Sequence, residues 1–223
     1  GNLTLRPFSN ITKILYDKDK KKASGVEVLD TMDNKTYEYK AKIIFVCASA
    51  LNSTWLLFNS ATDIWPGGLG SSSNELGHNV MDHHYNLGAS GDVEGFEDKT
   101  EYGRRPAGFY ITRFANIPGD KKRDFVRGFG YQGGASRQGW GREIAEMNIG
   151  ADFKEALAEP GSWRIGATGF GEILPYHENK ISLDKNVKDK WGLPVLSMDA
   201  EMKENEIKMR KDIKEELIAM LES

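Results

Sequence analysis

Apolar and polar residues alternate along most of the N-terminal part of the chain. The alternation runs through residues 11–17, 25–31 and 36–41, with turn-forming residues between these stretches. It predicts three strands joined as an antiparallel β-meander. Residues 42–48 break the alternation, because their centre is apolar on both faces. Such a run is typical of a strand buried in a parallel sheet, and it predicts that Cys47 is a small buried hydrophobe.

The rest of the chain mixes loops, strands and helices. Short helices are predicted at residues 49–60 and 151–158, and residues 62–106 are rich in glycine and serine and predict loops. Further strands are predicted at residues 107–114, 124–134, 163–175, 179–184 and 194–202. These elements indicate an α+β fold.

Residues 201–221 predict a C-terminal helix with one apolar stripe. The apolar residues at helical spacing are Met202, Ile207, Met209, Ile213, Leu217, Met220 and Leu221. We expect this stripe to face the core rather than a partner protein.

The predicted buried strand at residues 42–48 raises a difficulty. A buried parallel strand needs parallel neighbours and crossover helices, and no other segment has that character. We therefore expect the chain to be an internal piece of a larger α/β protein.

Composition narrows the functional classes. The 223 residues carry 33 acidic and 30 basic side chains, a net charge of −3. With no basic stripe, this balance gives no basis for nucleic-acid binding. No apolar run approaches the roughly 20 residues that a membrane span requires.

Residues 127–134, with the letters RGFGYQGG, match the glycine spacing of a dinucleotide-binding turn. A true turn of this kind lies between a buried strand and a helix. Here a charged stretch precedes the glycines, and Gly134, Gly139 and Gly141 follow where the helix would begin. We predict a strand instead, with Phe129 and Tyr131 on one face.

Three separated segments together resemble a known family. Residues 2–60 are similar to the middle of the flavin-dependent glucose-methanol-choline (GMC) oxidoreductases, where a β-meander leads into a buried strand, an Ala-Gly-Ala-like turn and a helix. Residues 75–84, ELGHNVMDHH, resemble the family's Gly-Arg-Asn-Leu-x-Asp-His segment. Residues 178–195 resemble its Asn-Arg-(apolar)-x-Leu-Asp…Asp-x-x-Gly-(apolar)-Pro segment. Residues 65–84 and 103–114 further resemble a branch that acts on sugars or glycosides, such as the glucoside 3-dehydrogenases.

The resemblance implies a parent enzyme that transfers a hydride from a CH–OH group of an alcohol or sugar to FAD. It implies a partial FAD-binding domain at residues 1–85, and a substrate-binding domain at residues 86–223 with an antiparallel sheet backed by helices. The family's dinucleotide turn and catalytic histidine would lie before Gly1 and after Ser223. No catalytic residue is therefore assigned, and we expect this piece alone to be inactive and to lack FAD.

The resemblance also marks candidate FAD contacts. They are Ile11, Ala48, Ser49, Ala50, Asn79, Asp82 and His83. Ser49 stands where the family has glycine, so the backbone approach to the cofactor is looser there. An equal alternative for Asn79, Asp82 and His83 is that they fix the local loop through backbone hydrogen bonds.

Candidate substrate contacts lie in the predicted substrate domain. They are Tyr131, Gln132, Arg137 and Trp140, which offer aromatic and hydrogen-bonding groups suited to a sugar. Packing within the sheet is an equal alternative for the aromatic residues. No metal site is predicted, because the histidines of HNVMDHH lack further ligands at suitable spacing.

The expected partners are a small alcohol or sugar substrate and, in the parent enzyme, an electron-acceptor subunit. One alternative is a non-enzymatic saccharide-binding module without redox chemistry. A further alternative is a structural subunit that docks another chain through its C-terminal helix, for which residues 203–216 offer little apolar surface.

Overall fold

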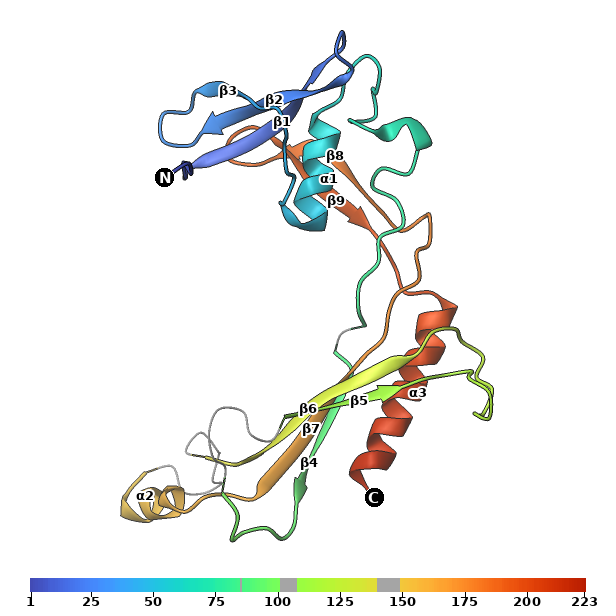
Figure 1. Cartoon of the computed structure of the whole chain (residues 1–223). Coiled ribbons are helices and arrows are strands. Elements are labelled where there is room, and N and C mark those ends of the chain that lie inside the picture. The colour runs from blue at the N-terminus through green and yellow to red at the C-terminus, as the bar shows by residue number, and fades with distance from the viewer. Residues whose placement is uncertain (85, 101–107, 140–148) are drawn as a thin grey trace. The chain divides into compact units, whose positions relative to one another are not determined.

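The computed structural model describes residues 1–84, 86–100, 108–139 and 149–223 (Figure 1). In chain order the elements are β1 (Ser9–Asp17), β2 (Lys22–Asp30), β3 (Thr36–Lys40), α1 (Ser49–Asn59), the short 3₁₀ helix η1 (Ser71–Ser73), β4 (Gly88–Val93), β5 (Gly108–Arg113), β6 (Phe129–Arg137), α2 (Ala151–Ala158), β7 (Trp163–Phe170), β8 (Lys180–Lys188), β9 (Pro194–Asp199) and α3 (Glu204–Leu221). Antiparallel sheets with few helices make this a mixed fold compatible with the α+β class. Within the described residues, no helix is long and apolar enough to cross a bilayer.

The chain forms two compact units, and each contains segments that are distant in the sequence. The first unit comprises Gly1–Val80 and Pro175–Glu201, and the second comprises Met81–Leu174 and Met202–Ser223. The sequence-based division at residue 85 left residues 175–201 in the second part, whereas the structure groups them with the first.

The first unit combines the β1-β2-β3 meander, the β8–β9 hairpin and α1. Ile14 and Val28 face the core from the sheet, and Leu56 faces it from α1. Ser60, at the end of α1, connects the helix to the sheet through hydrogen bonds. Its hydroxyl accepts a 2.7 Å hydrogen bond from the Ile14 N–H and donates a 2.6 Å bond to the Leu56 carbonyl. The buried Ser60 hydroxyl therefore has a hydrogen-bond partner both as a donor and as an acceptor.

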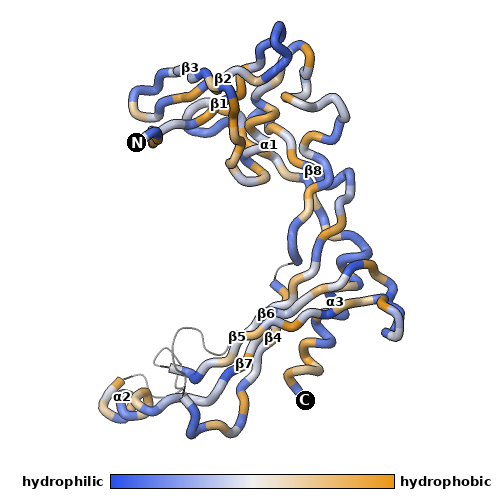
Figure 2. Tube along the Cα trace, in the orientation of Figure 1, coloured by the Kyte–Doolittle hydropathy of each residue, from blue (hydrophilic) through white to orange (hydrophobic). Residues whose placement is uncertain are grey.

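The second unit is built on a four-stranded antiparallel sheet in the order β4-β7-β6-β5. Helix α3 packs along one side of this sheet (Figure 1). The core between them contains Leu87, Phe125, Phe129, Tyr131, Ala167, Met209, Ile213 and Leu217. The strands β6 and β7 are mostly pale in Figure 2, because glycine, serine and alanine have intermediate hydropathy. The aromatic side chains of β6 and the apolar stripe of α3 therefore supply most of this core.

Helix α3 confirms the predicted C-terminal helix, with one change in its stripe. Met209, Ile213 and Leu217 are 0–3% exposed. Ile207 and Met220 are 62% and 38% exposed, so their placement on the core face was wrong. The buried face instead starts at Glu206, one residue before Ile207, because helical spacing relates position 206 to positions 209, 213 and 217.

Glu206 is buried because it caps the helix. Its Oε2 accepts from the Lys203 N–H at 2.8 Å, and its Oε1 accepts from the Leu174 N–H at 3.1 Å. Burial alone would raise the pKa of this carboxyl, but the backbone donors outweigh it and hold the pKa below its usual value.

The glycine pattern of residues 128–133 lies in a strand, as predicted. Strand β6 pairs with β5 on one side and β7 on the other. Phe129 and Tyr131 are 7% and 1% exposed and share the face toward α3. A Cβ atom at Gly133 would collide with the Gly166 carbonyl of the neighbouring strand, so this glycine permits close strand packing.

Candidate functional site

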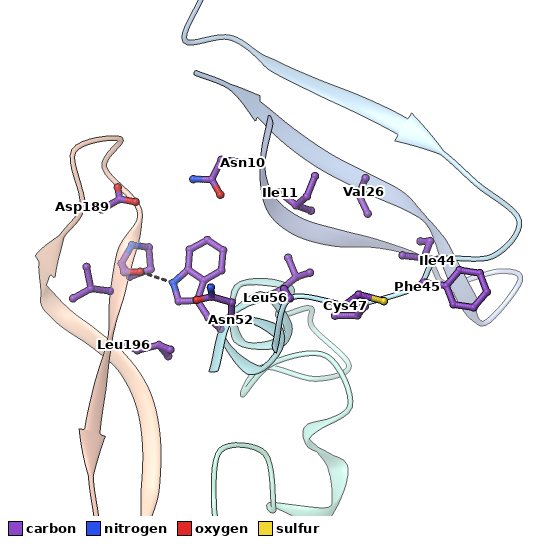
Figure 3. A pocket seen from close by; sticks show the side chains of 15 residues that line it. Asn10, Ile11, Val26, Ile44, Phe45, Cys47, Asn52, Leu56, Asp189 and Leu196 are labelled. Carbon is purple, nitrogen blue, oxygen red and sulfur yellow. Dashed lines mark hydrogen bonds between the residues drawn. The ribbon is translucent and has the colours of Figure 1, made fainter. Parts of the chain in front are cut away.

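A hollow of about 720 Å³ opens in the first unit (Figure 3). Its walls come from the face of β1 and β2, from α1 with the segment before it, and from the β8–β9 hairpin. Ile11, Val26 and Leu56 make the walls apolar. The Trp55 Nε1–H donates a 2.6 Å hydrogen bond to the Pro194 carbonyl and so holds α1 against the hairpin. The volume is in the range of about 300–1,000 Å³ typical of small-molecule sites.

The segment before α1 also lines this hollow, and here the sequence-based prediction was wrong. Residues 42–48 form no strand, and Ile43 and Phe45 are 71% and 83% exposed. Cys47 is exposed as well, not buried. A strand that is apolar on both faces needs hydrogen-bonded neighbours and covering layers, and the described residues supply none. Part of its apolar surface therefore faces the hollow.

Two of the candidate FAD contacts, Ile11 and Ala48, line the hollow. Ser49 and Ala50 begin α1 immediately after it. Ser49 has φ +62°, in the left-handed region that glycine adopts at little cost. The residue that replaces the family's glycine therefore keeps a glycine-like backbone conformation, under strain.

Asn79, Asp82 and His83 make local bonds. The Asn79 side-chain amide donates to Glu75 Oε2 at 2.6 Å, and Asp82 Oδ1 accepts from the His83 N–H at 2.7 Å. The His83 backbone forms an isolated antiparallel bridge with Glu172. These contacts are those that a loop-fixing role predicts. None of the three residues lines the hollow of the first unit.

The three candidate substrate contacts that the structure describes, Tyr131, Gln132 and Arg137, are not brought together. The Tyr131 side chain is in the core, where its hydroxyl donates to the Ile213 carbonyl at 2.9 Å. The Arg137 guanidinium donates to the Gly161 and Glu97 carbonyls at 2.6 and 2.8 Å, which ties two loops to the end of β6. Gln132 is exposed on the opposite face of β6 from Tyr131. Trp140 lies outside the described residues.

The face of the sheet that points away from α3 carries a second hollow, of about 570 Å³. Gln132 and Thr168 face each other across β6 and β7 on its rim, and Ser90 of β4 lies near them. Gly88 and Gly166 form part of its floor. Strict alternation along a strand explains why Gln132 reaches this face while Tyr131 fills the core. The sequence predicts this alternation, but it does not predict which face of the sheet α3 covers.

His84 is a buried histidine that the sequence did not single out. It is 1% exposed, and neither ring nitrogen has a hydrogen-bond partner among the described residues. It packs beside Gly171 and the Met209 sulfur, since a Cβ atom at Gly171 would lie close to both. Burial lowers the pKa of the ring, and the nearby Arg210 adds to this effect, while Glu206 opposes it. His84 is therefore held neutral.

Metal-ligand residue types do not converge. In the part of the chain that the structure describes, no three His, Cys, Asp or Glu side chains are grouped to hold a metal ion. His78 and His177 stack with ring centroids 4.0 Å apart, and His177 Nε2 lies 3.7 Å from Glu75 Oε1. His78 Nδ1 is 2.6 Å from the His177 carbonyl oxygen, so this pair closes a loop through its own contacts.

Comparison with known proteins identifies the class. Residues 2–85 match the family model of the GMC oxidoreductases. This segment contains the meander, α1 and most of the residues that line the apolar hollow. The chain belongs to the GMC oxidoreductase family.

Two curated relatives extend the similarity along the chain. The 2-methyl-1,2-propanediol dehydrogenase of Mycolicibacterium austroafricanum is 31% identical over 195 residues, which cover 83% of this chain and 34% of that protein. The fructose dehydrogenase large subunit of Gluconobacter japonicus is 26% identical over 164 residues, which cover 73% of this chain and 29% of that protein. The chain thus spans about a third of the length of these relatives.

Proposed function

We propose that the full-length protein is an FAD-dependent dehydrogenase or oxidase that oxidises a CH–OH group of an alcohol or sugar. In this proposal residues 1–85, most of which belong to the first unit, supply part of the cofactor site, and the second unit supplies a substrate surface. The cofactor, when bound, accepts the hydride. The residues of this chain bind the cofactor and the substrate and orient them relative to each other. The proton-accepting histidine expected from the family is not assigned to any residue here.

The hollow of the first unit is the observation that carries this proposal. Ile11 and Ala48, chosen from the sequence as cofactor contacts, both line it, and they lie within the segment that matches the family model. Its apolar walls suit the flat face of an adenine, and Asn10, Asn52 and Asp189 add hydrogen-bonding groups at the lining. The residues present therefore fit the adenosine part of FAD.

Ser49, Ala50, Asn79, Asp82 and His83 have supporting roles in the proposal. Ser49 and Ala50 set the direction of α1 at the edge of the hollow. The bonds of Asn79, Asp82 and His83 hold the loop after η1 in shape. The same loop-fixing contacts would serve a non-enzymatic saccharide-binding module, so they do not distinguish the two functions.

The experiment is a paired substitution in the full-length protein. Ala48→Trp fills the hollow, whereas Leu51→Trp places the same side chain on α1 outside the lining, where Leu51 is 44% exposed. We expect FAD at about one equivalent in the wild type and in Leu51→Trp, and at least a tenfold loss of FAD affinity in Ala48→Trp. Dye reduction with a panel of alcohols and sugars should follow FAD content.

Two results would contradict the proposal. One is a folded full-length protein that binds no flavin, and the other is an equal FAD affinity in the two tryptophan variants. Sugar binding without flavin would support the saccharide-binding module instead. The term "large subunit" in the name of the fructose dehydrogenase relative also supports an electron-acceptor subunit in this proposal, which co-purification from the native host would test.

A further inference from the structure

Two segments of the second unit are joined beside His84. Residues 82–84 pair with residues 171–173, which follow β7, through two backbone hydrogen bonds of 2.8 and 2.9 Å. In the first of these bonds the His84 N–H donates to the Gly171 carbonyl. Both segments belong to the second unit, so the His84 ring stands at a junction within that unit.

The start of helix α3 packs against the same ring. A Cβ atom at Gly171 would lie 3.1 Å from the His84 Nδ1 and 2.5 Å from the Met209 sulfur, so the imidazole and the methionine share one packed space. Glu206, about one turn before Met209, accepts a 3.1 Å hydrogen bond from the Leu174 N–H. The first two turns of α3 are therefore attached to the segment after β7 by a capping bond and by packing around His84.

The His84 ring lacks hydrogen-bond partners at this junction. Neither ring nitrogen has one among the described residues, and the side chain is 1% exposed. A neutral imidazole carries one donor and one acceptor, and each unpaired buried group costs about 1–3 kcal/mol. An apolar side chain would fill the space without this cost. What distinguishes the imidazole from such a side chain is that it can take up a proton near neutral pH.

The surroundings of the ring disfavour its protonated form. Burial is the main cause of the lowered pKa of His84, and the charges of Arg210 and of protonated His83 add to it. Glu206 opposes the effect, but its two oxygens already accept backbone N–H groups. The Glu172 backbone also opposes it, without the geometry of a hydrogen bond. A protonated ring therefore finds the Glu206 carboxylate already engaged.

This junction lies where the chain enters and leaves the second unit. The unit begins at Met81, is interrupted after Leu174 and resumes at Met202. Each of these residues is close in the sequence to His84 or to one of the two elements that pack against its ring. Opening of the junction would therefore loosen all three connections at once.

We propose that His84 is an acid-sensitive latch for the start of α3. While the imidazole is neutral, it holds residues 81–84 and 171–174 against the first two turns of the helix. Protonation releases this contact without unfolding the rest of the second unit. The lowered pKa of the buried ring means that the open form binds the proton more tightly, so acid shifts the population toward it. The latch would operate whether or not the protein is an oxidoreductase, since it involves the packing of the second unit alone.

Native-state hydrogen exchange in the full-length protein tests the latch. Protection factors are measured at pH 7.5 and 5.5, without urea and in low urea, for the amides of His84, Ile173 and Leu174, which all donate within the junction. We expect their protection to fall about three- to tenfold in acid, the range that one proton bound below about pH 6.5 allows. It should not change with low urea, because local opening exposes little surface. The amides of β6 are the reference, and their exchange should depend on urea because they open with the whole unit.

Two variants separate the latch from general effects of acid. His84→Leu removes the titrating group, so the pH dependence at Ile173 and Leu174 should disappear. His177→Leu, at an exposed histidine of the first unit, should retain it.

Three results would overturn the latch. They are equal protection at the two pH values in the wild type, a pH dependence that persists in His84→Leu, and junction amides that follow the urea dependence of β6. If His84→Leu does not fold, the NMR titration of the His84 Cε1–H resonance in the wild type decides. A midpoint below about pH 6.5 would support the latch, and one at or above that value would overturn it.

Discussion

Tyr131 and Gln132 are neighbours on β6 with opposite environments, so substitutions at the two positions should have opposite effects on stability and on substrate binding. Tyr131 is 1% exposed, packs edge-on against Phe129 with ring centroids 5.6 Å apart, and donates its hydroxyl to the Ile213 carbonyl. Burial raises the pKa of the Tyr131 hydroxyl above its usual value, so it remains a donor. Gln132 points away from this core.

The magnitudes follow from these contacts. Tyr131→Phe removes one buried hydrogen bond and keeps the ring, which costs about 0.5–1.5 kcal/mol. For a domain of this size that lowers the melting temperature by about 1–6 °C. Tyr131→Ala also removes the ring and leaves a cavity beside Ile213, at about 3–5 kcal/mol. Gln132→Ala, on the exposed face, should change stability by less than about 0.5 kcal/mol.

The assay measures both properties in the same variants of the full-length protein. Urea unfolding gives the change in free energy, and steady-state kinetics with a sugar substrate gives KM and kcat. We expect Tyr131→Phe to lose stability with KM within twofold of the wild type. We expect Gln132→Ala to keep its stability and to raise KM. The opposite result, a stable Tyr131→Phe variant with a raised KM, would refute the assignment of the two faces.

Three further predictions concern stability. Ser49→Gly should stabilise the protein by about 0.5–1 kcal/mol, because relief of the left-handed strain exceeds the entropy that glycine loses on folding; an unchanged urea midpoint would show no strain there. Since buried His84 has a lowered pKa, the unfolded chain binds more protons below about pH 6.5, and stability should fall there by up to about 1.4 kcal/mol per pH unit. His84→Leu should flatten this part of the urea-midpoint profile and His177→Leu, at an exposed histidine, should not. Glu206→Gln should cost about 1–2 kcal/mol through the two capping bonds, whereas Glu215→Gln on the exposed face of α3 should be neutral in the same assay.

Local patterns determined much of the fold in advance. Alternation gave β1, β2 and β3, and the spacing of Met209, Ile213 and Leu217 gave α3. These signals depend on neighbours within a few residues, which the sequence contains directly. The charged and glycine-rich surroundings of residues 128–133 likewise excluded a dinucleotide turn and predicted β6 correctly.

Long-range packing explains what the sequence did not reveal. The apolar run at residues 42–48 has strand character, but pairing depends on partner strands that the described residues do not provide. Tyr131 was a candidate substrate contact because aromatic residues serve sites and cores alike, and only the position of α3 shows that its face is the core. His84 gave no signal, because its burial depends on Gly171 and Met209, which are far away in the sequence.

The most direct measurement of the central claim is anaerobic flavin reduction in the purified full-length protein. We expect bound FAD whose visible absorption band bleaches when a monosaccharide is added, with half-reduction in Gln132→Ala requiring at least tenfold more sugar than in the wild type. A protein that contains no FAD, or one whose flavin remains oxidised with every alcohol and sugar in the panel, would contradict it.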